Sequence, residues 1–392
     1  MTPAARVQAA IEILDTIIVA ARGQGAPADR LVADWFRSRR FAGSADRRAV
    51  RALVFAAVRA CGEVPASGRA AMLALAFDDP ALAGLFDGSP HGPAPVADGE
   101  PVAARAPMPG WLAEALASSG IDAAGQQALL TRAPLDIRVN SLKADRASLA
   151  LPVAAAPTAA PQGLRLPSGT QVEAWPAWRD GLIEVQDTGS QLLCEAVSAA
   201  PGESVIDLCA GAGGKTLALA AAMAGLGRLI ACDIDRARLA RLHPRAARAG
   251  AGLIETRLLD PEREALALAD WAGRADAVLV DAPCSGTGTL RRNPEARWRL
   301  SPAAIGRLCA VQARLLDVAA GLVRPGGRLV FATCSLLDAE GCAQIAGFLA
   351  AHRGWRAAPP ALPAGRAQGA GWRLTPGDDG TDGFFVARLE RL

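Results

Sequence analysis

Short apolar runs alternate with helical stretches through the second half of the chain, and this alternation constrains the fold more than any other feature. The apolar runs are SVIDLC, LIACD, IETRLLD, DAVLVDAP and RLVFATC, and the helical stretches lie at 215–225, 236–249, 302–322 and 338–352. Such an order is typical of a parallel sheet with helices on both faces. We therefore predict an α/β, Rossmann-like domain over residues 186–392, which ends in a hairpin of WRLTP and FFVARLE.

The first part of the chain has a different pattern. Val7, Ile11, Leu14 and Ile18 recur at spacings of three and four residues, which predicts a helix, and a second such pattern begins at Leu31. The subsequent chain contains the helical signal WLAEALA and the β-prone runs DIRVN and GLIEV. We predict an all-α domain at 1–86, a linker rich in proline and glycine at 87–110, and a small α/β subdomain at 111–185.

Composition excludes several classes of protein. With 392 residues, of which 51% are hydrophobic and 21% charged, the chain is neither disordered nor fibrous. Its apolar stretches are shorter than the roughly 18 residues of a membrane span, and Glu12 and Asp15 interrupt the first one, so we expect no transmembrane helix and no signal peptide. Eight cysteines without a CxxC pair, beside three histidines, fit neither a disulfide scaffold nor a zinc site. We expect a cytoplasmic monomer with reduced thiols and no metal.

A glycine-rich loop follows the first apolar run of the Rossmann-like domain. In DLCAGAGGKT, residues 209–215 join a predicted strand to a predicted helix, where a doubly wound sheet binds the charged end of a nucleotide-like ligand. Gly211, Gly213 and Gly214 allow close approach of the backbone, and the next helix offers free amide groups. An ordinary tight turn explains the loop alone about equally well.

Two acidic residues at the ends of the next strands sharpen this interpretation. Asp233 ends LIACD and can accept both hydroxyls of a ribose, and Asp260 ends RLLD, where it can meet an adenine amine. The loop matches neither GxGxxG nor the phosphate loop GxxxxGK followed by Ser or Thr. S-adenosylmethionine therefore fits better than a nucleoside triphosphate.

Two further strand ends carry cysteines among small residues, Cys284 in DAPCSGTG and Cys334 in ATCS. Because the carboxyl ends of parallel strands face one crevice, we expect both thiols at one site. Carbon 5 of cytosine is a poor nucleophile, but a thiolate that adds to carbon 6 creates an enamine able to attack the methyl group of S-adenosylmethionine. A second group must then help to remove the carbon-5 proton, and Asp281 is placed to hydrogen-bond the cytosine edge. Five other cysteines are predicted to be buried small hydrophobic residues: Cys61, Cys194, Cys232, Cys309 and Cys342.

These motifs resemble those of the Nop/Sun family of RNA cytosine-5 methyltransferases, and within it the bacterial ribosomal RNA type with a NusB-like front domain. The matching segments are EVQDTGSQL, DLCAGAGGKT, Asp233 with Arg238 following, VDAPCSGTGTLRRNP, GGRLVFATCS and DGFF, which together cover about residues 135–392. The resemblance implies a class I S-adenosylmethionine-dependent methyltransferase domain, preceded by the small α/β subdomain and a NusB-like, RNA-binding helical domain. It also implies methylation of a cytosine in small-subunit (16S) ribosomal RNA.

The resemblance assigns roles to individual residues. Cys334 is the covalent nucleophile, Cys284 assists release of the methylated RNA, and Asp281 contacts the base. One departure is the sequence CAGAGG, where the family usually has CAAPGG, and we expect the missing proline at position 212 to make the loop more flexible. The residues assigned to the cofactor are Cys209, Ala210, Gly211, Ala212, Gly213, Gly214, Lys215, Asp233, Arg238, Asp260 and Asp281.

Two groups of arginines are candidates for phosphate contacts with RNA. For the first group, in the front domain, a solvated helix face explains the run nearly as well. The second group follows the Cys284 motif and is preferred, because we expect it close to the RNA channel. The first comprises Arg37, Arg39, Arg40, Arg47, Arg48 and Arg51, and the second comprises Arg291, Arg292, Arg297 and Arg299.

Two other functions remain open. In DNA cytosine-5 methylation the Pro-Cys thiol is the nucleophile, which makes Cys284 the attacking residue, although the TCS cysteine argues against this function. A non-catalytic RNA-binding ribosome assembly factor is the second alternative, and the altered CAGAGG loop is its only support. Separate replacement of the two cysteines tests the first alternative, and calorimetry with S-adenosylmethionine tests the second.

Overall fold

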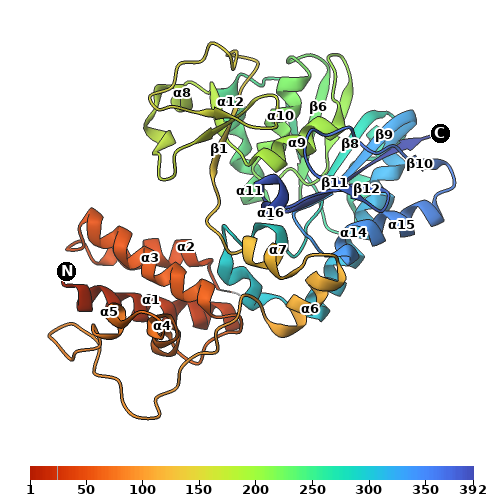
Figure 1. The fold of residues 1–392 in the computed structure, drawn as a ribbon. Coiled ribbons are helices and arrows are strands. Elements are labelled where there is room, and N and C mark those ends of the chain that lie inside the picture. Colours follow the sequence, from red (N-terminus) through yellow and green to blue (C-terminus); the bar gives the residue numbers. More distant parts are fainter. Residues whose placement is uncertain (24) are drawn as a thin grey trace. The chain divides into compact units, whose positions relative to one another are not determined.

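The computed structural model describes residues 1–23 and 25–392, which form two compact units (Figure 1). Unit 1 contains Met1–Arg132 and Thr289–Ser301, and unit 2 contains Ala133–Gly288 and Pro302–Leu392. Among the described residues, no helix is both long and apolar enough to cross a bilayer. The same part of the chain contains no cluster of three or more side chains suited to holding a metal ion.

Unit 1 is built from helices around one apolar core. Its first helix begins after Thr2, whose hydroxyl accepts a hydrogen bond from the backbone N–H of Ala5 at 3.2 Å. The apolar positions predicted for this helix are buried: Val7, Ile11, Leu14 and Ile18. The helices are α1 (Pro3–Arg22), α2 (Ala28–Ser38), α3 (Ser44–Ala60), α4 (Gly68–Ala76), α5 (Pro80–Ala83), α6 (Gly110–Ser118) and α7 (Ala123–Ala128), with a 3-10 helix η4 (Pro294–Arg299).

The segment Thr289–Ser301 completes the core of unit 1, although it follows the Cys284 motif in the sequence. The Trp298 side chain belongs to the same apolar cluster as α1, and its indole N–H donates to the carbonyl of Cys61 at 3.0 Å. The Arg297 guanidinium is fully buried and donates to the carbonyls of Val58 and Cys61, both at 2.7 Å. Because these side chains fill the helical core, the segment belongs to unit 1 and interrupts the range that we predicted for the Rossmann-like domain.

Unit 2 begins with a small antiparallel sheet of strand order β2-β3-β1-β4. The predicted β-prone runs DIRVN and GLIEV contribute β1 and β4, and Ile137 pairs with Val185. This agrees with the prediction of β-structure in the small subdomain, whereas residues 111–132 of the predicted subdomain belong to unit 1. The elements are β1 (Leu135–Val139), β2 (Ala156–Pro157), β3 (Gly163–Leu166), η1 (Val172–Ala174), α8 (Pro176–Arg179) and β4 (Ile183–Val185).

The rest of unit 2 is a large sheet with helices on both faces, as predicted for a Rossmann-like methyltransferase domain (Figure 1). The strand order is β11-β12-β13-β9-β8-β5-β6-β7, and β10 pairs with β13. The strands from β7 to β9 in this order are parallel, whereas β13, β12, β11 and β10 are antiparallel additions. The predicted terminal hairpin is confirmed, because β12 pairs with β13 through Leu374 and Phe384.

The bounds of these elements follow the apolar periodicity closely. The strands are β5 (Ser204–Asp207), β6 (Arg228–Asp233), β7 (Ile254–Leu258), β8 (Ala275–Asp281), β9 (Val323–Thr333), β10 (Trp355–Ala357), β11 (Arg366–Gln368), β12 (Gly371–Leu374) and β13 (Phe384–Arg391). The α-helices are α9 (Thr188–Val197), α10 (Gly214–Ala222), α11 (Arg236–Ala240), α12 (Leu242–Ala249), α13 (Glu264–Ala267), α14 (Pro302–Leu322), α15 (Cys342–Ala351) and α16 (Pro376–Asp379). The 3-10 helices are η2 (Ala269–Trp271), η3 (Thr287–Thr289) and η5 (Asp338–Glu340).

Alternate residues of the central strands enter two separate cores. Val205 of β5 lies in one apolar cluster with residues of α9 and α10, whereas Ile206 lies in a second cluster with residues of α14 and α15. This alternation is the expected result when both faces of a sheet are covered. It fixes the register of β5, at whose carboxyl end the glycine-rich loop begins.

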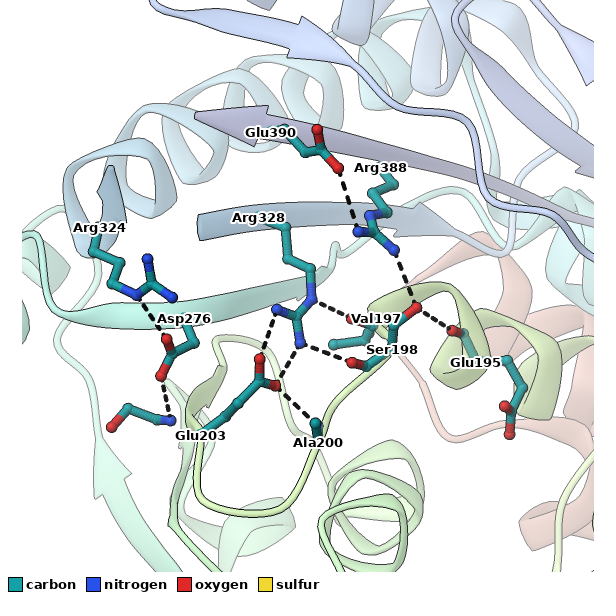
Figure 2. A network of polar contacts seen from close by, with 11 residues as sticks. Glu195, Val197, Ser198, Ala200, Glu203, Asp276, Arg324, Arg328, Arg388 and Glu390 are labelled. Atoms are coloured by element: carbon teal, nitrogen blue, oxygen red, sulfur yellow. Dashed lines mark hydrogen bonds and ion pairs between the residues drawn. The ribbon is translucent and has the colours of Figure 1, made fainter. Parts of the chain in front are cut away.

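The amino ends of the central strands are joined by a network of arginines and carboxylates (Figure 2). Arg328 of β9 donates to both carboxylate oxygens of Glu203, at 2.9 and 2.5 Å. Asp276 of β8 accepts from the Arg324 guanidinium at 2.6 Å and from the backbone N–H of Ser204 at 2.8 Å. The charges of Arg328, Glu203, Arg324 and Asp276 are therefore paired within this network.

Candidate active site

A cavity of about 420 Å³ lies at the carboxyl ends of the parallel strands in unit 2. β5 occupies the switch point of the sheet, since the chain continues from it to β6 on one side and later to β8 on the other. Ligands of doubly wound sheets bind at this point. Six residues that the sequence singled out line the cavity: Cys209, Asp233, Arg238, Asp281, Cys284 and Cys334.

The glycine-rich loop is bent back toward the end of β6. The backbone N–H of Gly211 donates to Asp233 Oδ2 at 2.7 Å. Gly211 and Gly213 have φ of +57° and +85°, a region that favours glycine. A Cβ on Gly213 would lie 2.1 Å from Leu242 Cδ1, so this position has no room for a side chain.

Arg245 holds the loop at the position where the family proline is missing. Its Nη1 donates to the carbonyl of Ala212 at 2.5 Å, and its Nη2 pairs with Glu184 at 3.0 Å. A buried ion pair therefore restrains the loop from outside, which opposes the flexibility that we expected from the loss of proline.

Asp233 combines structural contacts with access to the cavity. Its Oδ1 accepts from the backbone N–H of Asp235 at 2.8 Å, in addition to the bond from Gly211 to Oδ2. Each carboxylate oxygen can accept a second hydrogen bond. The side chain is therefore fixed in place and retains acceptor capacity for a ligand in the cavity.

Lys215, in the first turn of α10, forms an ion pair with Asp281 at the carboxyl end of β8. Lys215 Nζ lies 2.7 Å from Asp281 Oδ2. Burial by itself would lower the pKa of Lys215, but the charge of Asp281 raises it above its ordinary value. Lys215 therefore keeps its charge at neutral pH, and the Asp281 carboxylate beside it lines the cavity.

The two strand-end thiols lie together, as predicted, with 3.4 Å between the Sγ atoms of Cys284 and Cys334. The hydrogen bond from Cys284 lowers the pKa of Cys334 below that of an ordinary thiol. The same hydrogen bond, together with burial, raises the pKa of Cys284. Cys334 is thus the better thiolate of the pair.

The remaining cysteines have the opposite electrostatic environment. Burial raises the pKa of Cys61 to about 11 and that of Cys194 to about 12. The pKa is likewise raised, with burial as the largest cause, for Cys209, Cys232, Cys309 and Cys342. The prediction that Cys309 and Cys342 are buried is wrong, because both are only partly buried. Of the eight cysteines, all of which are described, Cys334 alone has a lowered pKa.

Two predictions about site residues differ from the structure: one concerns Asp260, and the other concerns the arginines that follow the Cys284 motif. Leu259 lines the cavity, whereas the Asp260 carboxylate is 68% exposed and lies 3.7 Å from Arg263. The expectation that Arg297 contacts RNA phosphates is wrong, because its buried guanidinium binds backbone carbonyls within unit 1. Arg299 is similarly engaged, since it donates to the carbonyls of Gly25 and Ala26 at 2.8 Å each.

The first arginine group also contains engaged members. Arg37 pairs with Asp34 at 2.7 Å, Arg39 lies 3.3 Å from Glu12, and Arg51 pairs with Asp29. Arg39 further stacks on the Trp35 ring, with 4.2 Å from its central carbon to the ring centroid. Arg47 donates to the carbonyl of Ala42 at 2.9 Å. The remaining members are exposed on unit 1: Arg40 and Arg48.

Sequence reasoning missed several polar residues of the site. Glu264 and Arg314 line the cavity and form an ion pair at 2.5 Å. Glu340 is fully buried beside the two cysteine loops, where its carboxylate accepts from the Ser335 hydroxyl at 2.7 Å. A carboxylate six residues after the cysteine of the TCS motif is a weak signal, because nothing in the local pattern distinguishes it from a solvated acid.

Comparisons with known proteins agree with this geometry. Residues 195–390, half of the chain, match the family described as 16S rRNA methyltransferase RsmB/F. The probable ribosomal RNA small subunit methyltransferase B of Synechocystis sp. is 35% identical over 269 residues, which cover 66% of this chain and 60% of that protein. The ribosomal RNA small subunit methyltransferase B of Xylella fastidiosa (strain 9a5c) is 37% identical over 297 residues, 74% of this chain and 69% of that protein.

A solved structure shares the fold. The crystal structure of a methyltransferase homologue protein from Pyrococcus horikoshii superposes with a TM-score of 0.60 at 24% identity, and the match covers 73% of this chain and 100% of that one. The chain spans about three fifths of the length of the Synechocystis relative. From the family match and these relatives, the chain belongs to the RsmB/F family of 16S rRNA methyltransferases.

Proposed function

We propose that this protein is an S-adenosylmethionine-dependent methyltransferase that methylates carbon 5 of a cytosine in small-subunit ribosomal RNA. Family membership and the names of the relatives support ribosomal RNA as the substrate. The observation that carries the cytosine-5 chemistry is the pair of thiols 3.4 Å apart, of which Cys334 has the lowered pKa.

The residues around the cavity fit S-adenosylmethionine. Asp233 retains acceptor capacity for the ribose hydroxyls, and Leu208, Val311 and Leu315 provide apolar walls suited to an adenine ring. Gly213 keeps the loop free of a side chain where the backbone turns toward the ligand. When bound, the cofactor supplies an electrophilic methyl group on a sulfonium.

The side chains of the chain itself account for activation of the base. Cys334 Sγ adds to carbon 6 of cytosine as a thiolate, which moves electron density to carbon 5. Asp281, paired with Lys215, accepts a hydrogen bond from the exocyclic amine of the base. In the final stage the carbon-5 proton passes to water and the bond from sulfur to carbon 6 breaks, so that Cys334 leaves as a thiolate. Cys284, which retains its proton, assists by donating a hydrogen bond to the departing sulfur.

RNA binding draws on the exposed arginines of unit 1. We assign phosphate contacts to Arg40 and Arg48, because these residues are exposed. The target base leaves its stack to reach the thiols, as enzymes that react with a nucleobase require.

Bisulfite sequencing tests both the methylation reaction and the position of the methylated cytosine in the RNA. RNA is compared from cells that lack the gene and from the same cells complemented with the wild type or with Cys334→Ala. We expect one protected cytosine in small-subunit ribosomal RNA that returns with the wild type alone. An unchanged cytosine map would contradict the catalytic proposal and favour a non-catalytic assembly factor.

Separate replacement of the thiols tests their roles. We expect covalent attachment of the enzyme to RNA to persist or accumulate in Cys284→Ala and to vanish in Cys334→Ala. The reverse pattern would assign the attack to Cys284, as in the DNA-type mechanism, and would overturn the proposed roles.

A further inference from the structure

Glu340 is a carboxylate held entirely by neutral donors inside unit 2. It is fully buried in the 3-10 helix η5, six residues after Cys334. Oε1 accepts from the backbone N–H of Ser285 at 2.9 Å and from Gln312 Nε2 at 3.1 Å. Oε2 accepts from the Ser335 hydroxyl at 2.7 Å and from the Ser285 hydroxyl.

These contacts fall on the immediate neighbours of both reactive thiols. Ser285 follows Cys284, and Ser335 follows Cys334. The residues that precede the thiols are tied to the same cluster, because Gln312 donates to the carbonyl of Pro283 at 2.9 Å. On the other loop, the Thr333 hydroxyl donates to the Glu340 carbonyl at 3.3 Å. Each cysteine is thus bracketed on both sides by bonds that lead to Glu340.

The charge of Glu340 does not help to activate the thiols. A buried negative charge disfavours a nearby thiolate, and Glu340 raises rather than lowers the pKa of both Cys284 and Cys334, although the bond between the thiols is the largest influence on each. Burial of a carboxylate is itself unfavourable unless its hydrogen bonds are made. What the carboxylate provides is four acceptor sites in one place, which an amide cannot match because its nitrogen only donates.

We propose that Glu340 is a positioning residue that sets the separation of Cys284 and Cys334 through its bonds to Ser285 and Ser335. Its consequence for catalysis rests on the proposed function, because that reaction needs both thiols on one base. The separation itself is measurable without any methyl transfer, so the two proposals fail independently.

The first experiment measures how readily the two thiols join. Diamide oxidises the full chain: each thiol gives up its proton, an S–S bond forms, and diamide takes up two electrons and two protons to become a hydrazine. Mass spectrometry after proteolysis follows the Cys284–Cys334 link in the wild type, Glu340→Gln and Glu340→Ala. Glu203→Gln is the matched control, since this carboxylate also accepts several hydrogen bonds but lies in the network at the amino ends of the strands.

We expect the link to form about tenfold or more slowly in Glu340→Ala, less slowly in Glu340→Gln, and within about twofold of the wild type in Glu203→Gln. A wild-type rate in Glu340→Ala would overturn the proposal. If Glu340→Ala does not fold, Glu340→Gln decides by the same criterion, and a rate equal to that of the control counts against positioning.

The second experiment separates positioning from a merely structural role. In Glu340→Gln, the pH midpoint for alkylation of Cys334 by iodoacetamide should move to lower pH, because a negative charge near the thiolate is removed. At the same time kcat for methyl transfer should fall by about 10- to 100-fold, while KM for RNA stays within about threefold. A more reactive thiol combined with a slower enzyme is the signature of positioning, and an unchanged kcat would overturn it.

Discussion

The two ends of strand β8 carry the same residue type in opposite circumstances. At the amino end, Asp276 is held by Arg324 and by a backbone amide within a network whose charges satisfy one another (Figure 2). At the carboxyl end, Asp281 has Lys215 on one side and a cavity with two thiols on the other. At the amino end the Asp276 charge is paired with that of Arg324. At the carboxyl end, Asp281 can still accept hydrogen bonds from a ligand, and Cys334 is a thiol with a lowered pKa.

The carboxyl ends of the strands also contain a buried carboxylate that is only partly hydrogen-bonded. Asp207 ends β5 at the carboxyl side, where it is fully buried and accepts one bond from the Thr216 hydroxyl at 2.6 Å. Its other oxygen has no hydrogen-bond partner among the described residues. Stability is therefore concentrated at one end of the sheet, and strain and reactivity at the other.

Removal of charge at the reactive end should have the largest effect. Asp281→Asn keeps the shape of the side chain but removes the negative charge assigned to the cytosine edge, so we expect kcat/KM for methyl transfer to fall by about 100- to 1,000-fold. Asp276→Asn, at the other end of the same strand, should stay within about threefold. Incorporation of labelled methyl groups into RNA measures both, and equal losses would abolish the distinction between the two ends.

Loss of the central arginine of the amino-end network should have the next largest effect, this time on stability. The Arg328 side chain is 12% exposed, and in Arg328→Met the Glu203 carboxylate loses its charged donor. We expect the free energy of unfolding in urea to fall by about 2–3 kcal/mol. The rate of diamide linkage between the thiols in the folded protein should not change, and a slower rate would show that the two ends are coupled.

Stability should depend on pH through Asp207. Burial raises its pKa to about 7, whereas in the unfolded chain it releases its proton near pH 4. Between these values the folded protein holds a proton that the unfolded chain has lost, so this contribution to stability falls as pH rises from about 4 to 7 and is constant above. Asp207→Asn should therefore be about 1–3 kcal/mol more stable than the wild type at pH 8, with the difference vanishing near pH 4. Urea unfolding at several pH values measures it, and a difference independent of pH would contradict the assignment.

The smallest effect is expected at the exposed rim of the amino-end network. The Arg324 side chain is 48% exposed, so Arg324→Met should lower the free energy of unfolding by only about 0.5 kcal/mol. The difference should shrink further in 1 M salt, because exposed ion pairs are screened. A loss as large as that of Arg328→Met would mean that the network acts as one unit.

The sequence predicted what depends on local pattern. Periodicity located the strands and helices of the large sheet, and the carboxyl-end rule brought Cys284, Cys334 and Asp281 to one cavity. The predicted helix at 236–249 is instead divided at Arg241 into α11 and α12, because Pro244 has no N–H to donate to the carbonyl of Ala240. The ion pair of Lys215 with Asp281 joins residues 66 positions apart, and no local pattern reports it.

The residues that were missed act over long sequence separations. Glu340 bonds to Ser285 across 55 positions and to Gln312 across 28, so neither serine nor glutamine shows its role in its own neighbourhood. The arginines after the Cys284 motif were misread for the same reason. A run of arginines looks the same in the sequence whether its side chains face solvent or are buried. Arg297 is buried in the helical core of unit 1, where it binds the carbonyl of Cys61, 236 residues earlier in the chain.

The place of Thr289–Ser301 in unit 1 has a consequence for synthesis of the chain. Met1–Arg132 leave the ribosome before Arg297 and Trp298, which complete the core of unit 1, have been synthesised. Ala133–Gly288 must be translated before these two residues. At about 5–20 residues per second, this delay lasts on the order of ten to thirty seconds. Most of unit 1 is therefore synthesised first, but its core cannot be completed until Thr289–Ser301 have been translated. Its nascent apolar surface is an expected client for chaperones during that interval.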